Sequence, residues 1–168
     1  MSLENVELEK FSVYKFSIDY PPVCRVEFNP KSRREEGHMV FHFPDKEKIF
    51  LSWGELEKAQ KSFSTSKEHA NHSIKIMKKM DNVRNLEIAS QDSIMVNTHD
   101  ATYSRLRFEG VSLGLVTRRK GIPHEAYSLH LHCDQTSRYF IIYTMLTQQT
   151  PEGFSELFVL MANSFKCH

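Results

Sequence analysis

Two strand-like runs between residues 123 and 143 carry the clearest hydrophobic pattern in the chain, and the polar turn 134–137 joins them. Alternation with period two places successive side chains on opposite faces of a sheet. The second run, 139–143, is continuously apolar and aromatic, which predicts a strand buried on both faces. The first run predicts a half-buried strand, because apolar and polar positions alternate: Leu129, Leu131 and Cys133 against Ser128, His130 and His132.

Shorter runs with strand-like alternation lie on either side of the helical region. Proline turns punctuate them, as expected where a strand must end. The polar residues 1–10 predict a loose arm ahead of the first strand. The predicted strands are 14–20, 24–28, 38–43, 49–51 and 101–108, with a hairpin-like pair at 86–88 and 94–96 around residues 90–92, and exposed turns or loops at 98–100 and 110–121.

Two capping boxes predict where helices begin. Ser52 with Glu55, and Thr65 with Glu68, have the S/T-x-x-E spacing that satisfies the first free amides of a helix. They predict a short helix over 53–63 and a longer one over 66–80. A third helix is predicted after Pro151, because apolar residues recur there at helical spacing: Phe154, Leu157, Phe158, Met161 and Phe165.

The order of strands, two helices, further strands and a final helix predicts a single α+β domain over residues 1–168. An α/β/α sandwich, with a central and mainly antiparallel sheet flanked by helices, accounts for this order. With 168 residues and 40% hydrophobic content, the chain is long enough to bury a sizeable core.

Charge and hydropathy exclude several function classes. The net charge is +1, from 22 basic and 21 acidic residues, which disfavours nucleic acid as a partner. No apolar run is long enough to span a bilayer, and the charged start lacks the apolar core of a signal peptide. The expected location is therefore the cytoplasm. Composition does not predict an oligomeric state.

In the order of its elements, the chain resembles the PsbP-like α/β/α sandwich family, which includes an extrinsic protein of photosystem II and a Ran-binding nuclear-transport factor. The residues that carry the resemblance are 16–21 (FSIDYP), 49–53 (IFLSW), 138–140 (RYF) and 164–165 (SF). The resemblance implies a non-enzymatic binding module whose partner is another protein or a small ligand. No motif allows the photosystem or Ran-binding residues to be transferred, and the charged residues 1–10 do not predict a signal or lipoprotein segment like that of the exported members.

Histidine placement suggests an alternative function. His130 and His132 lie two apart on a strand, so both imidazoles point to the same face. Together with His168, which follows Cys167, they are a candidate ligand set for zinc or copper. The leading hypothesis needs no cofactor. The alternative is a metal-binding protein that uses histidines of the 128–133 strand, and a polar strand face packed under a helix would explain the same residues. His69 and His72 form a further pair that is typical of a helix surface.

A small-molecule hydrolase is a second alternative. Candidate groups are Cys133 with His130, which alternation places on opposite faces, and Ser93 with His99 and Asp100. No G-x-S-x-G or glycine-rich phosphate loop accompanies them.

Two further features leave alternatives open. Cys24, Cys133 and Cys167 are expected as reduced thiols, although a Cys133–Cys167 disulfide would suit an oxidising compartment. A basic edge could form from Arg105, Arg107 and residues 118–120.

Overall fold

The structure, a computed structural model, describes residues 7–111 and 121–168. Its strands form a seven-stranded sheet in the order β3-β4-β5-β9-β8-β7-β6 and a separate hairpin, β1-β2. Every pairing in both sheets is antiparallel. In chain order the elements are β1 (Glu9–Val13), β2 (Phe16–Tyr20), β3 (Arg25–Phe28), β4 (Gly37–His42), β5 (Lys48–Glu55), α1 (Leu56–Gln60), α2 (Ser66–Met77), β6 (Val83–Val96), β7 (His99–Gly110), β8 (Ile122–Cys133), β9 (Arg138–Thr147) and α3 (Phe154–Ser164).

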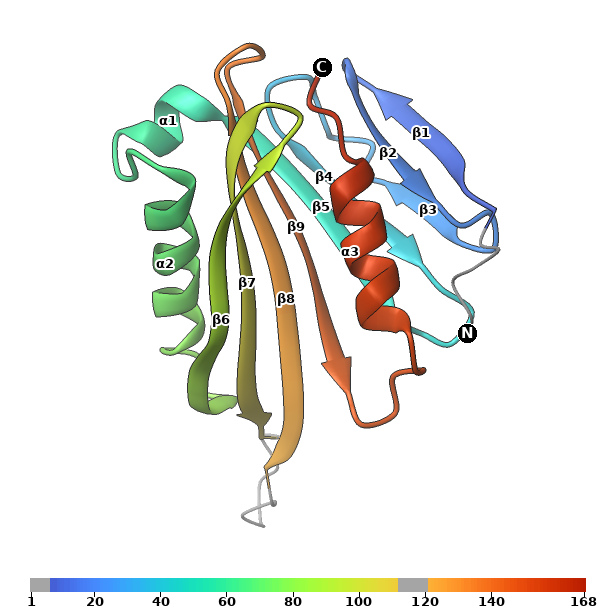
Figure 1. The fold of residues 1–168 in the computed structure, drawn as a ribbon, viewed down its shortest axis with the longest axis vertical. Coiled ribbons are helices and arrows are strands. Elements are labelled where there is room, and N and C mark those ends of the chain that lie inside the picture. Colours follow the sequence, from blue (N-terminus) through green and yellow to red (C-terminus); the bar gives the residue numbers. More distant parts are fainter. Residues whose placement is uncertain (1–6, 112–120) are drawn as a thin grey trace.

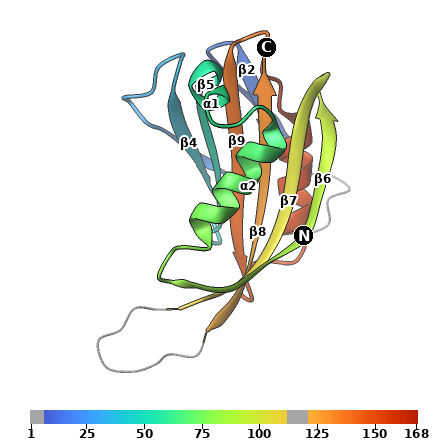
Figure 2. The same cartoon turned by 90° about the vertical axis from the view of Figure 1, so that its left-hand side faces the viewer.

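The large sheet is the middle layer of a sandwich. Helix α2 packs on β7 and β8 from one side, and α3 packs on β2, β8 and β9 from the other. Figure 1 shows α3 and the β1-β2 hairpin beside one another, and Figure 2 shows α2 in front of the sheet with α3 behind it. The predicted α+β sandwich with a mainly antiparallel sheet is therefore confirmed.

The main core lies on the α3 side of the sheet. Aromatic side chains from β2, β5, β9 and the segment after α3 meet there, with ring centroids of Phe16 5.0 Å from Trp53 and 5.5 Å from Phe140, and of Phe165 4.8 Å from Phe140. All four are buried. Burial of this much apolar surface holds α3 and the β1-β2 hairpin against the sheet.

The second capping box is confirmed and the first is wrong. Thr65 is the N-cap of α2, and its side chain accepts a hydrogen bond from the Glu68 amide. Ser52 instead lies inside β5, paired with His38 and Ile141. Pairing on both sides of β5 outweighs a local cap signal, so the predicted helix over 53–63 shrinks to the five residues of α1.

Three other predictions of local structure are corrected. The segments 86–88 and 94–96 belong to one long strand, β6, because residues 90–92 continue the ladder with β7. The turn that follows is Asn97-Thr98, and His99 and Asp100 begin β7. Glu9 and Lys10, assigned to a loose arm, pair in β1. The predicted loop 110–121 falls mostly outside the described residues.

The burial of the central hairpin is the reverse of the prediction. In β8, residues 129–133 are all buried, because α2 covers the face that carries the histidines. In β9, Tyr139, Ile141 and Tyr143 are only partly buried. The strand with polar alternation is therefore the one enclosed on both faces.

Candidate functional site

An apolar groove lies between α2 and the sheet. Its volume is about 260 Å³, and side chains of β5, β8 and β9 form its floor. Three large apolar residues on its walls are unusually exposed: Ile76 (54%), Met80 (45%) and Met145 (44%). Beside it, the rings of Phe50 and Tyr143 stack at 4.8 Å, and both residues are half-buried. This face of the sheet is incompletely covered by the chain's own helices.

Basic side chains flank the groove. Lys75 on α2, and Lys78 and Lys79 directly after it, are exposed and neighbour Ile76 and Met80 in sequence. In the part of the chain that the structure describes, these lysines form no ion pair. The groove therefore combines an apolar floor with a positively charged margin.

A layer of polar side chains separates the other end of α2 from the sheet. His69 Nδ1 lies 3.2 Å from His132 Nε2, and Ser73 Oγ lies 3.0 Å from His130 Nε2. Ser73 also donates to the His69 carbonyl oxygen at 3.2 Å. A hydroxyl donates one proton, so His130 Nε2 is the donor to Ser73 and its Nδ1 is unprotonated. That Nδ1 is buried and has no partner among the described groups.

The environment of this layer favours neutral imidazoles. Burial, reinforced by His132 and His72, lowers the pKa of His69 to about 4. Burial, reinforced by His69 and His132, lowers the pKa of His130 to about 3. His69 is also enclosed by the rings of Phe63 and Tyr139. It is thus a buried residue, whereas the sequence analysis placed it on a helix surface.

A cluster of two thiols and two imidazoles lies on the opposite face of β8. Cys133 Sγ is 3.7 Å from His99 Nε2 and 3.9 Å from His168 Nδ1. Cys167 Sγ is 3.3 Å from His168 Nδ1. The four ligand atoms all lie within 4.8 Å of one another. Both cysteines are fully buried and free, while His99 is intermediate and His168 is exposed.

The pKa values of the two thiols in this thiol–imidazole cluster move in opposite directions. The hydrogen bond with the Cys167 thiol, helped by Thr136 and His168, lowers the pKa of Cys133. The same hydrogen bond, together with burial, raises the pKa of Cys167. Arg138, 2% exposed, lies close by and donates to the carbonyl oxygens of Cys167 and Tyr14.

The structure divides the predicted metal ligands between two places. His130 and His132 face α2 and contact Ser73 and His69. His168 belongs to the thiol–imidazole cluster on the other face. Within the described residues, that cluster alone brings three or more His, Cys, Asp or Glu ligand atoms together at this spacing. Metal binding by His130 and His132 stays a prediction. The sequence analysis missed His99 and Cys133 as ligands, although the odd-numbered phase of β8 places Cys133 on the α3 face.

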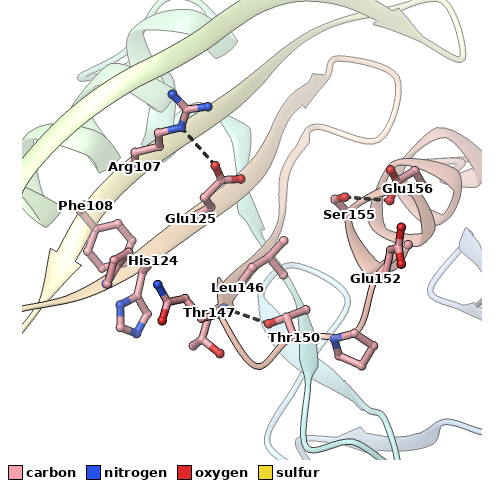
Figure 3. Close-up of a pocket in the computed structure, with 14 residues that line it drawn as sticks. Arg107, Phe108, His124, Glu125, Leu146, Thr147, Thr150, Glu152, Ser155 and Glu156 are labelled. Atoms are coloured by element: carbon pink, nitrogen blue, oxygen red, sulfur yellow. Dashed lines mark hydrogen bonds and ion pairs between the residues drawn. The ribbon is translucent and has the colours of Figure 1, made fainter.

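A larger and more polar pocket of about 550 Å³ lies at the far end of the sheet (Figure 3). Glu125 inside it is engaged by Arg105 at 2.8 Å, Arg107 at 3.1 Å and the Tyr127 hydroxyl at 2.9 Å. These contacts account for both arginines of the predicted basic edge. Residues 118–120 lie outside the described residues. Ser155 in the same pocket donates to Glu156. In a catalytic triad, a serine is hydrogen-bonded to a general base that a third residue orients. Ser155 is hydrogen-bonded to the Glu156 carboxylate instead.

The two predicted catalytic groupings do not assemble. Cys133 and His130 point to opposite faces of β8, as alternation requires. The Asp100 carboxylate accepts a hydrogen bond from Ser66, and His99 contacts Cys133. His99 and Asp100 therefore have separate partners.

Neither protein-family models nor curated proteins match this sequence. Among solved structures, cyanobacterial PsbP (CyanoP) from Synechocystis sp. PCC 6803 aligns with a TM-score of 0.64 at 12% identity, covering 100% of this chain and 96% of that one. The fold is PsbP-like. This agrees with the resemblance drawn from the sequence.

Two other solved structures share the PsbP-like fold. The Ran-binding protein Mog1p of Saccharomyces cerevisiae aligns with a TM-score of 0.59 at 12% identity, over 96% of both chains. A Bacteroides thetaiotaomicron protein aligns with a TM-score of 0.56 at 13% identity over 95% of this chain, which spans 48% of that longer one. At these identities the likeness shows the fold alone. None of the described helices is both long enough and apolar enough to cross a membrane.

Proposed function

We propose that the protein is a non-enzymatic binding module whose groove beside α2 receives an apolar segment of a partner protein, flanked by acidic residues. The observation that carries this proposal is the groove itself, with Ile76, Met80 and Met145 exposed on its walls. Large apolar side chains left exposed together mark interaction sites more often than scattered ones do.

The size of the groove favours a protein partner over a free small ligand. Small-molecule sites have volumes of roughly 300–1,000 Å³ and enclose most of their ligand. At about 260 Å³ and open along one side, this groove suits one or two anchoring side chains of a larger partner.

Charge favours acidic flanks on that partner. Lys75, Lys78 and Lys79 lie next to the exposed apolar residues at the end of α2 and directly after it, and they are available to pair. Opposite charges at the margin of an interface speed association and select the partner more than they strengthen binding. A likeness of fold adds support by analogy, since Mog1p is a Ran-binding protein.

The cytoplasm is the proposed place of action. The three buried cysteines are unpaired, which suits a reducing compartment.

Peptide selection tests the groove while the partner is still unidentified. Random peptides displayed on phage are selected on the folded protein and then measured individually against three variants. We expect selected peptides to carry Leu, Phe or Trp anchors beside Asp or Glu. Met80→Glu should weaken them by on the order of tenfold or more, and Lys79→Glu by less.

Leu160→Glu supplies the matched control, because Leu160 is similarly exposed (39%) but lies on α3, across the sheet. The groove would not be the binding surface if the selected peptides bound Met80→Glu with the same affinity as the parent. Equal losses of affinity in Met80→Glu and Leu160→Glu would lead to the same conclusion. Selection of basic peptides would contradict the proposed charge of the partner.

A further inference from the structure

Four side chains that differ widely in sequence position converge at the end of the sheet where the described chain finishes. His99 begins β7, Cys133 ends β8, and Cys167 and His168 follow α3. We propose that these four residues bind a zinc ion in a closed, structural site. The proposal is independent of the groove beside α2, which lies on the other face of the sheet.

The spacing of the ligand atoms matches a tetrahedral zinc site. Zn–S bonds of about 2.3 Å and Zn–N bonds of about 2.0–2.1 Å place neighbouring ligands of a tetrahedron about 3.4–3.8 Å apart. Three of the separations in the cluster are 3.3, 3.7 and 3.9 Å, and none exceeds 4.8 Å. An ion could therefore enter with small side-chain adjustments.

Contacts hold the backbone at or beside three of the ligands, and Cys133 among them pairs with Arg138 in the β8–β9 ladder. The two-residue turn Asn97-Thr98, with φ of 48° and 70°, sets the start of β7 and therefore the position of His99. Asn97 Nδ2 donates to the Phe165 carbonyl oxygen at 2.8 Å, which ties this turn to the segment after α3. Lys166, next to Cys167, exchanges two 2.8 Å backbone hydrogen bonds with Ser17. The ligands are thus pre-positioned by the fold.

Ligand chemistry selects the class of metal. Two sulfurs and two imidazoles suit zinc and disfavour calcium or magnesium, which take oxygen ligands. Both thiols lose their protons on binding, so two thiolates balance the charge of a divalent ion. Four protein ligands leave no open position for a substrate, which is typical of a structural site. The full burial of Cys133 and Cys167 also makes them poor candidates for a nucleophile that a substrate must reach.

The exposed His168 provides the way in. Its side chain is the one exposed ligand of the four, so an ion can meet it first and then displace the thiol protons. A bound ion would then tie the segment after α3 to β7 and β8, which covalent connectivity does not do.

Metal titration of the untagged protein tests the site. The protein is stripped with a chelator under a thiol-free reductant and titrated with zinc against a chromophoric competitor. Cobalt is then used as a spectroscopic probe. We expect one equivalent of zinc and a cobalt spectrum with the thiolate charge-transfer band of a tetrahedral sulfur-containing site. His168→Ala and Cys167→Ser should each weaken zinc binding by more than about tenfold.

Control variants decide between this site and other sources of binding. His168→Ala alters an exposed side chain and should stay folded, so it keeps the test valid if Cys167→Ser does not. His124→Ala, which changes a histidine outside the cluster, should bind zinc like the parent. The His130→Ala/His132→Ala double variant should also retain the zinc if it stays folded.

Several results would overturn the proposal. These are no stoichiometric zinc in the reduced protein, unchanged affinity in both His168→Ala and Cys167→Ser, or loss of zinc only in the His130→Ala/His132→Ala variant. A Cys133–Cys167 disulfide found in protein that was protected from oxidants during purification would also overturn the proposal, because the disulfide consumes both sulfur ligands.

Discussion

On the α3 face of the sheet, the buried side chains are largely apolar and aromatic, and they enclose Phe16, Phe140 and Phe158 completely. On the α2 face, a smaller apolar cluster of Ile74, Leu106, Phe108 and Ala126 adjoins a layer of serine, threonine and histidine side chains, and this face opens into a groove. Both faces bury β8, yet the larger apolar core lies on the α3 face, while buried hydrogen bonds are added to the smaller cluster on the α2 face. The comparison suggests that stability resides mainly on the α3 face, while the α2 face keeps surface available for recognition.

Truncating the α3 core should have the largest effect. Phe158→Ala removes a ring that is fully buried against Tyr103 and Tyr127. We expect a loss of about 3–5 kcal/mol in the free energy of unfolding, measured by urea denaturation. Leu160→Ala, on the exposed side of the same helix, should change it by less than about 1 kcal/mol. Equal losses in the two variants would remove the contrast between the faces.

Zinc binding at the thiol–imidazole cluster should have the second largest effect on the free energy of unfolding. A ligand that binds only the folded state adds about 2.7 kcal/mol when its free concentration is 100 times Kd. Thermal unfolding with and without zinc should show this gain in the parent and its loss in His168→Ala. A gain of similar size in His168→Ala would place the stabilising ion elsewhere.

Acid should act through the α2 face. The pKa values of His69 and His130, about 4 and about 3, lie below the ordinary 6.5. Between pH 4 and pH 6.5 the unfolded chain therefore binds more protons than the folded chain. The contribution of these two histidines to the free energy of unfolding is complete above pH 6.5 and declines as the pH falls toward 4. We expect a loss on the order of 2 kcal/mol over this range, measured by urea denaturation of the metal-free protein. His130→Leu should flatten the decline, and His124→Leu should leave it unchanged. A decline of the same slope in His130→Leu would exclude His130 as its source.

Substitution in the groove should have the smallest effect on stability. Met80 is exposed, so Met80→Glu should shift the free energy of unfolding by no more than about 0.5 kcal/mol. The same variant is expected to lose peptide binding. Unfolding by more than about 2 kcal/mol would instead show that Met80 belongs to the core.

Local signals predicted the regular elements well and the site poorly. The Thr65 cap and the spacing of apolar residues around Leu157 located α2 and α3, because both signals lie within a few residues. The Ser52 signal failed because that segment pairs with the preceding strand β4 and with β9, which is distant in sequence, and both pairings place it in the sheet. A helix from elsewhere in the chain likewise buries His130, which no local pattern reveals.

The thiol–imidazole cluster depends on contacts between three segments that lie far apart in the sequence. His99, Cys133 and the pair 167–168 share no spacing that marks a metal site, and they meet only because β7, β8 and the segment after α3 reach the same end of the sheet. Alternation correctly separated Cys133 from His130. It could not say that His99 would lie on the cysteine's side.

Every neighbouring pair of strands in the large sheet is consecutive in sequence except β5 and β9. The chain is thus two local meanders, β3-β4-β5 and β6-β7-β8-β9, whose joining closes a long loop that contains α1 and α2. Loop-closure entropy makes such a late, non-local step costly, so folding kinetics should be limited by the pairing of Leu51 with Ile142. The groove beside α2 takes its floor from both meanders, from Ser52 on one and Ile141 on the other. A partner that binds there would recognise only chains in which this final step is complete.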